Sequence, residues 1–254
     1  MDKLDGKNIV ITGGSRGFGL ATAQACSAAG AQVAVASRSA TALAAAVKKL
    51  QPTGTAMGVV CNVANLAEVE ALEKQVKEAW GHIDVWINNA GIAGPYGPTL
   101  CVAPDDFTAV LDVNILGTYY GSLVAMRGFL SQGYGKLINI LGRGDKQPAP
   151  MQNAYGSSKV WVLNFTRALA QENKDSGVSI FAYNPGMMRT ELLMDVDVIA
   201  GYEDRLKPME TIVRMWAKTP EIPAQKVVRL ASSASDGKTG LVLQETNPFS
   251  LLMG

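Results

Sequence analysis

The sequence predicts an α/β fold, in which a doubly wound parallel sheet of about seven strands carries helices on both faces. Three observations support this prediction. Short apolar runs rich in β-forming residues alternate with longer stretches of helical periodicity along the 254 residues. Hydrophobic residues make up 48% of the chain, which is ample for one large core. Neither a repeat nor a linker divides the chain, so a single domain over 1–254 is expected.

In the first half of the chain, each predicted strand leads into a helix. A glycine-rich turn precedes the first helix, which Gly30 closes in a C-terminal cap position. Ser39 is a candidate N-cap for the second helix, and the third helix is amphipathic, with acidic residues spaced ahead of basic ones. The elements expected here are strands at 8–12, 32–37 and 55–63 and helices at 18–30, 39–50 and 66–81.

The second half continues the alternation, and proline marks two of its boundaries. Pro104 suits the first turn of a long helix, and Pro185 stops the sixth strand. Residues 187–220 are irregular with helical pieces, and their position after the sixth strand predicts a substrate lid that excludes water. The other elements expected here are strands at 83–91, 136–141, 178–186 and 240–245 and helices at about 104–130, 153–173 and 223–232.

Composition argues against several classes of protein. The formal net charge is +1 and no basic block occurs, so a nucleic-acid partner is not expected. No signal-peptide pattern and no apolar run long enough to span a bilayer are visible, and the three scattered cysteines are typical of reduced thiols; a cytoplasmic protein is predicted. His82 is the only histidine, so a histidine-based metal site or a Ser-His triad is not available, and no metal is expected.

The stretch TGGSRGFG, residues 12–19, lies directly after the first strand and before a helix. Its glycines let a phosphate approach the backbone, where the helix N-terminus favours an anion. At the end of the second strand, where NAD-binding sheets place an acidic residue, this chain has Ser37 and Arg38, and Arg16 lies in the glycine loop. Two guanidinium groups suit a 2′-phosphate, so NADP(H) is expected over NAD(H); the alternative is that both arginines are solvated surface charges.

Further motifs follow the glycine loop in a specific order. They are NNAG at 88–91, DVNILG with Asn114, YGSSK with Tyr155 and Lys159, and NPGMMRT at 184–190. With these motifs at these intervals, the chain resembles the short-chain dehydrogenase/reductase family over nearly its whole length. The resemblance implies a Rossmann-type sheet, a nicotinamide cofactor, and hydride transfer at a carbonyl or alcohol.

The resemblance also implies roles for three catalytic residues. Tyr155 is expected to be the general acid/base, Lys159 to orient the cofactor ribose and lower the pKa of Tyr155, and Asn114 to hold a water in the proton relay. The physical chemistry of the residues agrees, because positions i and i+4 share one helix face and a nearby cation favours the phenolate. The structural alternative, a buried aromatic residue and a surface lysine on an ordinary helix, is disfavoured by the other motifs.

The cofactor site implied by the resemblance draws on every loop at one edge of the sheet. Asn62 stands where an Asp is usual beside the adenine, Asn89 and Gly91 shape the fourth strand's end, and Thr190 is expected near the nicotinamide carboxamide. The full expected set is Thr12, Gly13, Ser15, Arg16, Gly17, Phe18, Gly19, Ser37, Arg38, Asn62, Val63, Asn89, Ala90, Gly91, Tyr155, Lys159, Pro185, Gly186, Met188 and Thr190.

One position departs from the family. The usual serine lies thirteen residues before the tyrosine, where this chain has Gly142. A glycine side chain cannot donate to the substrate oxygen, but it is expected to leave room for a bulky carbonyl compound or a water. The remaining candidate donors are such a water, a backbone N–H of Gly142 or Arg143, and the Arg143 guanidinium. Restoring a serine is expected to retain or raise activity on small ketones, because it restores a donor, and to lower activity on the bulky natural substrate, because it fills the space that this substrate needs.

Methionines are frequent in the expected lid. Thioethers adapt to irregular apolar ligands, although the same side chains could simply pack the lid against the domain. The lid methionines are Met187, Met188, Met194, Met209 and Met215, and the expected substrate-binding set is Gly142, Arg143, Met187 and Met194. Two helices, at 111–126 and 155–170, are apolar on much of their circumference, which predicts a homodimer or homotetramer, with the apolar stretch 247–254 as a further contact.

The predicted function is NADPH-dependent reduction of a fairly large apolar ketone or aldehyde. A narrower alternative comes from the segment NPGMMRTELLM, which resembles chlorophyll b reductases and implies a chlorophyll-type formyl group as substrate. A second alternative is a non-catalytic NADPH-binding protein that has lost its serine. The presence of Asn114, Tyr155 and Lys159 argues against that loss of activity, because a sensor needs only the glycine loop.

Overall fold

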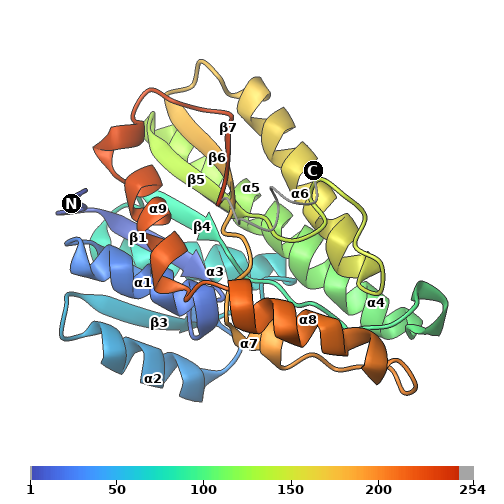
Figure 1. The fold of residues 1–254 in the computed structure, drawn as a ribbon. Helices are drawn as coiled ribbons and strands as arrows, with labels where there is room; N and C mark the ends of the chain where they lie inside the picture. Colours follow the sequence, from blue (N-terminus) through green and yellow to red (C-terminus); the bar gives the residue numbers. More distant parts are fainter. Residues whose placement is uncertain (1, 246–254) are drawn as a thin grey trace.

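A computed structural model describes residues 2–245, apart from the side chains of residues 208–210 and 214. Within this part of the chain a seven-stranded sheet has the order β3-β2-β1-β4-β5-β6-β7, and every neighbouring pair is parallel (Figure 1). The predicted fold class is confirmed. The strands are β1 (Asn8–Thr12), β2 (Gln32–Ser37), β3 (Ala56–Val60), β4 (Val85–Asn88), β5 (Gly135–Ile140), β6 (Val178–Asn184) and β7 (Leu241–Gln244).

Helices cover both faces of the sheet. Buried side chains of α1, α2 and α9 pack on one face, and those of α3, α5 and α6 pack on the other. Both predicted caps are present: Ser39 Oγ accepts from Ala42 N–H at 3.2 Å, and Gly30 follows α1 with a φ of +102°. The helices are α1 (Gly17–Ala28), α2 (Ala40–Leu50), α3 (Leu66–Trp80), α4 (Pro104–Leu111), α5 (Gly117–Gln132), α6 (Asn153–Glu172), α7 (Glu191–Met194), α8 (Glu203–Trp216) and α9 (Glu221–Ala231).

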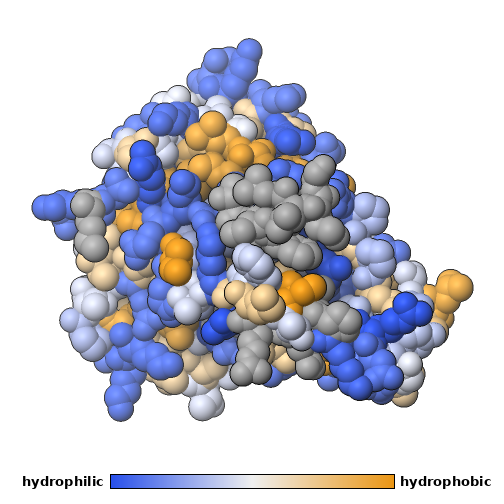
Figure 2. All heavy atoms as spheres, in the orientation of Figure 1, coloured by the Kyte–Doolittle hydropathy of each residue, from blue (hydrophilic) through white to orange (hydrophobic). Residues whose placement is uncertain are grey.

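The central strands are buried on both sides. Along β1, Ile9 and Ile11 belong to one core cluster and Val10 to the opposite one, and all three are fully buried. This alternation follows from the two-residue period of a strand and explains why β1 is a continuous apolar run. The outer surface differs: on the face drawn in Figure 2 hydrophilic residues predominate, and hydrophobic ones lie in separate groups.

The long helix predicted at about 104–130 contains an irregularity. A π-helical turn, Asp112–Leu116, separates α4 from α5. By length and composition alone this region passes the criterion for a membrane-crossing helix: Pro104–Gln132 has 29 residues, and its most apolar window has a mean hydropathy of 1.2. Half of that window is buried inside the fold. The core helix of a sheet-based domain meets the same criterion of length and composition.

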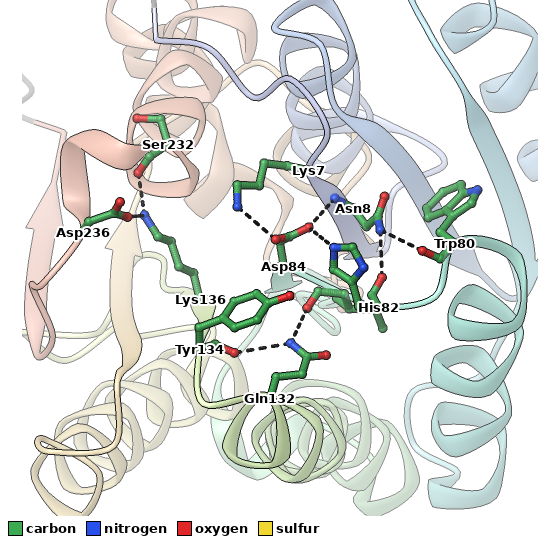
Figure 3. A network of polar contacts seen from close by, with 11 residues as sticks. Lys7, Asn8, Trp80, His82, Asp84, Gln132, Tyr134, Lys136, Ser232 and Asp236 are labelled. Carbon is green, nitrogen blue, oxygen red and sulfur yellow. Dashed lines mark hydrogen bonds and ion pairs between the residues drawn. The ribbon is translucent and has the colours of Figure 1, made fainter.

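The amino edge of the sheet carries a network of polar contacts (Figure 3). The buried carboxylate of Asp84 pairs with Lys7 Nζ at 3.0 Å and His82 Nε2 at 3.2 Å, and it accepts from the Asn8 backbone N–H at 2.8 Å. Nearby, Lys136 Nζ lies 2.7 Å from Asp236 Oδ1 and also donates to Ser232 and Ser235. These contacts tie the start of β1 to β4 and the start of β5 to the segment after α9.

Candidate active site at the carboxyl edge of the sheet

A large cavity of about 1390 Å³ lies at the carboxyl edge of the sheet. The segments that follow all seven described strands contribute to its lining. This is the place where a doubly wound sheet binds its ligands. Of the residues expected at the site, those that line the cavity are Gly13, Ser15, Arg16, Gly17, Phe18, Gly19, Ser37, Arg38, Asn62, Val63, Asn89, Ala90, Gly91, Gly142, Arg143, Tyr155, Lys159, Pro185, Gly186, Met187, Met188 and Thr190.

The glycine loop brings backbone to the cavity without side chains in the way. Gly13 has a φ of +65°, and a Cβ there would lie 2.8 Å from Ala90 Cα, so only glycine fits between β1 and the segment after β4. Helix α1 begins at Gly17, and neither a capping side-chain bond from Arg16 nor an acidic residue occupies its first turn. The open N–H groups at this helix end suit a phosphate.

Thr12 does not line the cavity, although the resemblance places it in the cofactor site. Its buried hydroxyl accepts from the backbone N–H groups of Asn89 and Ala90, at 3.1 and 3.2 Å. The side-chain amide of Asn89 in turn donates to Thr12 O at 3.0 Å and Gly13 O at 3.1 Å. Thr12 and Asn89 therefore hold the glycine loop against the end of β4. Thr12 contributes to the shape of the cavity through these hydrogen bonds and does not line it.

Positive charge collects at the end of β2. Arg16 and Arg38 are both exposed on the cavity wall, and neither forms an ion pair with another residue in the described part of the chain. Ser37 also lines the cavity and donates weakly to Ser39 O at 3.4 Å. Asn62 uses its Oδ1 to accept from Ala64 N–H at 3.2 Å, so its amide nitrogen remains available.

Tyr155 and Lys159 lie in the first two turns of α6, on the wall below the lid. The Lys159 ammonium is 5.5 Å from the centroid of the Tyr155 ring and donates to Ile140 O at 3.1 Å. Lys159 is only 5% exposed. The two side chains thus share one helix face at the cavity, as their spacing predicts.

Asn114 lies behind this pair and not in the cavity lining. It is fully buried in the π-helical turn, where its Nδ2 donates to Ile92 O and to Ser158 Oγ, both at 3.0 Å, and its Oδ1 accepts from Ile92 N–H at 2.9 Å. Both amide donors are therefore taken by protein, and Asn114 fixes the segment after β4 against α6. π-Helical turns often occur at functional sites, because they aim a side chain that an α-helix would place elsewhere.

The ionisation of Tyr155 differs from the sequence prediction. Burial and the carboxylate of Asp145 raise the pKa of Tyr155 to about 12, against the lowering effect of the Arg143 guanidinium. Burial also lowers the pKa of Lys159 to about 8, although Asp145 opposes that shift. The net shift of the Tyr155 pKa is therefore opposite in direction to the expected lowering, and Lys159 is not among its causes. The phenol is held in its protonated form, which is the form that donates a proton.

Gly142 does not leave open space, which corrects a second prediction. A Cβ at position 142 would collide with the Tyr155 hydroxyl, and it would lie 3.1 Å from Tyr155 Cζ and 3.5 Å from Lys159 Cε. The phenol itself therefore fills the volume that a side chain at 142 would use. A serine at 142 and the tyrosine ring in this position exclude one another.

Asp145 is a site residue that the sequence reasoning missed. It lines the cavity and is 8% exposed, and its Oδ2 accepts from Asn184 Nδ2 at 2.9 Å. The same Asn184 nitrogen donates to Gly142 O at 3.2 Å, and Asp145 N–H donates to Gly142 O at 3.4 Å. The sequence shows an aspartate three residues after position 142, where the family usually has a serine. Its approach to Tyr155 depends on a tight turn that only the fold reveals.

The segment expected as a lid contains α7 and α8. Leu192, Leu193 and Ile212 join Met187 and Met188 on the cavity wall. Met194 and Met215 are 61% and 66% exposed and do not line the cavity, and the Met209 side chain lies outside the described residues. Among the methionine side chains that the structure describes in this segment, the prediction thus applies to Met187 and Met188.

Comparisons with known proteins agree with this site. A family model described as short chain dehydrogenase matches residues 7–198. The 4-formylbenzenesulfonate dehydrogenase of Comamonas testosteroni is 32% identical over 239 residues, covering 92% of this chain and 94% of that protein. These comparisons do not show the narrower resemblance to chlorophyll b reductases.

Two solved structures share the fold and hold different cofactors. A 3-ketoacyl-(acyl-carrier-protein) reductase from Brucella melitensis, complexed with NADH, is 25% identical with a TM-score of 0.84, and the match covers 94% of this chain and 96% of that one. A variant of actinorhodin polyketide ketoreductase with NADPH is 29% identical with a TM-score of 0.82, covering 94% and 95%. The chain belongs to the short-chain dehydrogenase/reductase family, whose members include the relatives described here.

Proposed function

We propose that this family member reduces the carbonyl group of an apolar ketone or aldehyde with NADPH, and that Tyr155 donates the proton. The observation that carries the proposal is the placement of Tyr155 with Lys159 on the wall of the large cavity, where burial raises the pKa of the phenol. A reductase needs a proton donor at the carbonyl oxygen, and a phenol that stays protonated at neutral pH meets this need.

The residues around the glycine loop fit a dinucleotide. The open N-terminus of α1 suits the pyrophosphate, and Gly13 allows it to approach the backbone. The two exposed arginines, Arg16 and Arg38, would pair with a 2′-phosphate, which supports NADPH over NADH. When bound, the cofactor supplies the hydride. The protein then has to orient the substrate, exclude water and deliver one proton.

The substrate side of the cavity is largely apolar. Ile92, Leu192, Leu193 and Ile212 line it, and Arg143 and Gln152 supply polar groups, with Arg143 Nη1 lying 3.5 Å from Gln152 Oε1. With no side-chain donor at position 142, the Arg143 guanidinium and the backbone N–H groups of this turn are the candidate partners for the substrate oxygen. An aldehyde on a large ring, including a chlorophyll-type formyl group, belongs in the same substrate class.

A panel assay tests the proposal. Oxidation of NADPH is followed with small and bulky aldehydes and ketones, and turnover of at least one bulky apolar compound is expected. The non-catalytic alternative predicts tight NADPH binding without turnover on any compound. Binding is therefore measured separately, by cofactor fluorescence, so that a protein that binds and does not react is recognised.

We also propose that α5 and α6 form the contact in a homodimer or homotetramer. Leu116, Tyr119, Leu130 and Val160 are between 36% and 48% exposed although they lie on or beside these helices. The rings of Trp161 and Phe165 stack at 4.7 Å between centroids. The stretch 247–254, expected to add a contact, lies outside the described residues. Light scattering is expected to give a dimer or tetramer, and Val160→Glu is expected to shift it toward the monomer.

A further inference from the structure

Asp145 is a buried carboxylate without a counter-ion. It is 8% exposed, and in the described part of the chain no lysine, arginine or histidine nitrogen lies within ion-pair distance of it. A charge in such a place is costly unless hydrogen bonds or nearby charges stabilise it. Its one side-chain partner is Asn184, which donates to Oδ2 at 2.9 Å. Tyr155 and Lys159 of the proposed reaction therefore share the cavity wall with a carboxylate that forms no close ion pair within the described residues.

The turn that carries Asp145 is rigid. Asn184 Nδ2 bonds both Gly142 O and Asp145 Oδ2, and Asn184 Oδ1 accepts from Gly186 N–H at 2.9 Å. Gly144, with a φ of +99°, packs so tightly on Gly156 of α6 that a Cβ there would clash with its backbone. The carboxylate is thus held by β6 on one side and by α6 on the other, and its position relative to Tyr155 is set by the fold.

Several charged groups surround this carboxylate. The turn itself contributes Arg143 and Lys146, and α6 contributes Tyr155 and Lys159. From the end of β7, Glu245 also lines the cavity, but Lys218 pairs with it at 2.9 Å. Among carboxylates, Asp145 alone acts on both Tyr155 and Lys159: it raises the pKa of each.

We propose that Asp145 is a positioning residue whose fixed negative charge keeps Tyr155 protonated and Lys159 charged, and so extends carbonyl reduction into the alkaline range. The inference rests on the proposed function. In that reaction the carbonyl carbon gains a hydride from the reduced nicotinamide, the carbonyl π bond breaks, and the oxygen takes the phenol proton. Loss of the proton from Tyr155, or of the charge from Lys159, stops the step. Asp145 opposes both losses, because a negative charge disfavours a phenolate and favours an ammonium.

The test uses Asp145→Asn, which removes the charge and leaves an oxygen to accept from Asn184. The alkaline limb of kcat/KM for carbonyl reduction is expected to move to lower pH by about one unit. The alkaline limb is expected to move in this direction whether it reports the ionisation of Tyr155 or that of Lys159. Asp175→Asn, the same change at an exposed residue after α6 and outside the cavity, is expected to leave the profile of the parent protein unchanged. An unshifted limb in Asp145→Asn overturns the proposal.

A second measurement does not depend on turnover. The ε-methylene resonance of Lys159 is titrated by nuclear magnetic resonance in the apo protein and assigned by its disappearance in Lys159→Met. In Asp145→Asn its midpoint is expected to fall by about one pH unit, and an unchanged midpoint contradicts the proposal. If the parent protein reduces no carbonyl compound, the proposed function fails while this titration still decides the role of Asp145. Asp145→Ser carries both measurements if Asp145→Asn does not fold.

Discussion

The two edges of the sheet differ in how several of their charged residues are paired. At the amino edge, Asp84 is surrounded by Lys7, His82 and the Asn8 N–H, and Lys136 meets Asp236 and two serines (Figure 3). At the carboxyl edge, Arg16 and Arg38 are exposed without ion pairs among the described residues, and Asp145 is buried without one. The charges at the amino edge form ion pairs that stabilise the fold. The three charges named at the carboxyl edge have no ion-pair partner among the described residues, so they are available to a bound ligand or to a proton.

This difference predicts that substitutions at the two edges affect different quantities. A change at the amino edge should lower the free energy of unfolding and leave the chemistry intact. Replacing a charged residue at the carboxyl edge should alter binding or turnover and cost little stability. In each of the following experiments, a variant at one edge is measured beside a control variant that is expected to behave differently.

The largest effect is expected for Tyr155→Phe. The substitution removes only the proton donor, so kcat/KM should fall by about a hundred- to ten-thousandfold, while the dissociation constant of NADPH stays nearly unchanged. Tyr134→Phe, at an exposed position outside the cavity, should keep parental activity. Both variants are assayed on the same carbonyl compound, and parental turnover in Tyr155→Phe would show that another group is the acid.

The counterpart at the amino edge is Asp84→Asn. It leaves Lys7 and His82 without their buried partner, so the free energy of unfolding should fall by about 2–4 kcal/mol. Denaturant titration measures the loss. Because Asp84 is at the opposite edge from the cavity, the pH profile of kcat/KM should not move. Asp145→Asn should instead move the pH profile of kcat/KM and change the free energy of unfolding little. Equal effects of the two variants on both quantities would contradict the proposed difference between the two edges.

Arg38→Asp tests the open charge at the end of β2. The substitution removes a charge-assisted contact to a 2′-phosphate and adds repulsion, so affinity for NADPH should fall by roughly ten- to a hundredfold relative to NADH. Fluorescence titration with both cofactors gives the ratio. Arg229→Asp on α9, outside the cavity, should leave it unchanged. Equal affinities for the two cofactors in the parent protein would remove the basis of this prediction.

The smallest effect is expected for Gly142→Ser. The new Cβ meets the Tyr155 hydroxyl, so the ring has to move, and a shift of this kind typically costs about 1–3 kcal/mol. We expect kcat/KM to fall by about tenfold on small and bulky substrates alike. Combining Gly142→Ser with Tyr155→Phe separates the causes: the double variant should be no less stable than Gly142→Ser alone, because the clashing oxygen is gone. A gain of activity on small ketones would instead support a restored donor.

The sequence predicts the elements well because their signals are local. The apolar run at Asn8–Thr12, the cap at Ser39 and the glycine at Gly30 each act within a few residues, and the structure places them as predicted. The glycine loop and the Tyr155–Lys159 pair are also local motifs, so their place at the cavity could be foreseen. The borders of strands were harder, since the predicted strand at 83–91 ends at Asn88 where the cavity begins.

The missed features depend on contacts between distant segments. Asp145 is held at the site by its hydrogen bond from Asn184 of β6, and the space beside Gly142 is occupied by the Tyr155 ring of α6. No spacing in the sequence reveals either contact. The ionisation of Tyr155 has the same cause, because burial sets its direction and burial is a property of the fold. The π-helical turn could not be foreseen either, since the bonds of Asn114 to Ile92 and Ser158 hold it.

That turn has a consequence for how the helix can change. A π-helical turn is an α-helix with one residue inserted, so α4 and α5 are out of phase by roughly one residue's rotation. Deletion of a single residue within Asp112–Leu116 would restore a regular helix, but it would also swing the face of α4 away from α6 and remove Asn114 from Ile92. The position of the active-site segment after β4 therefore depends on the extra residue of the π-helical turn. Deleting one residue from this turn is expected to disturb the site more than most substitutions within the turn.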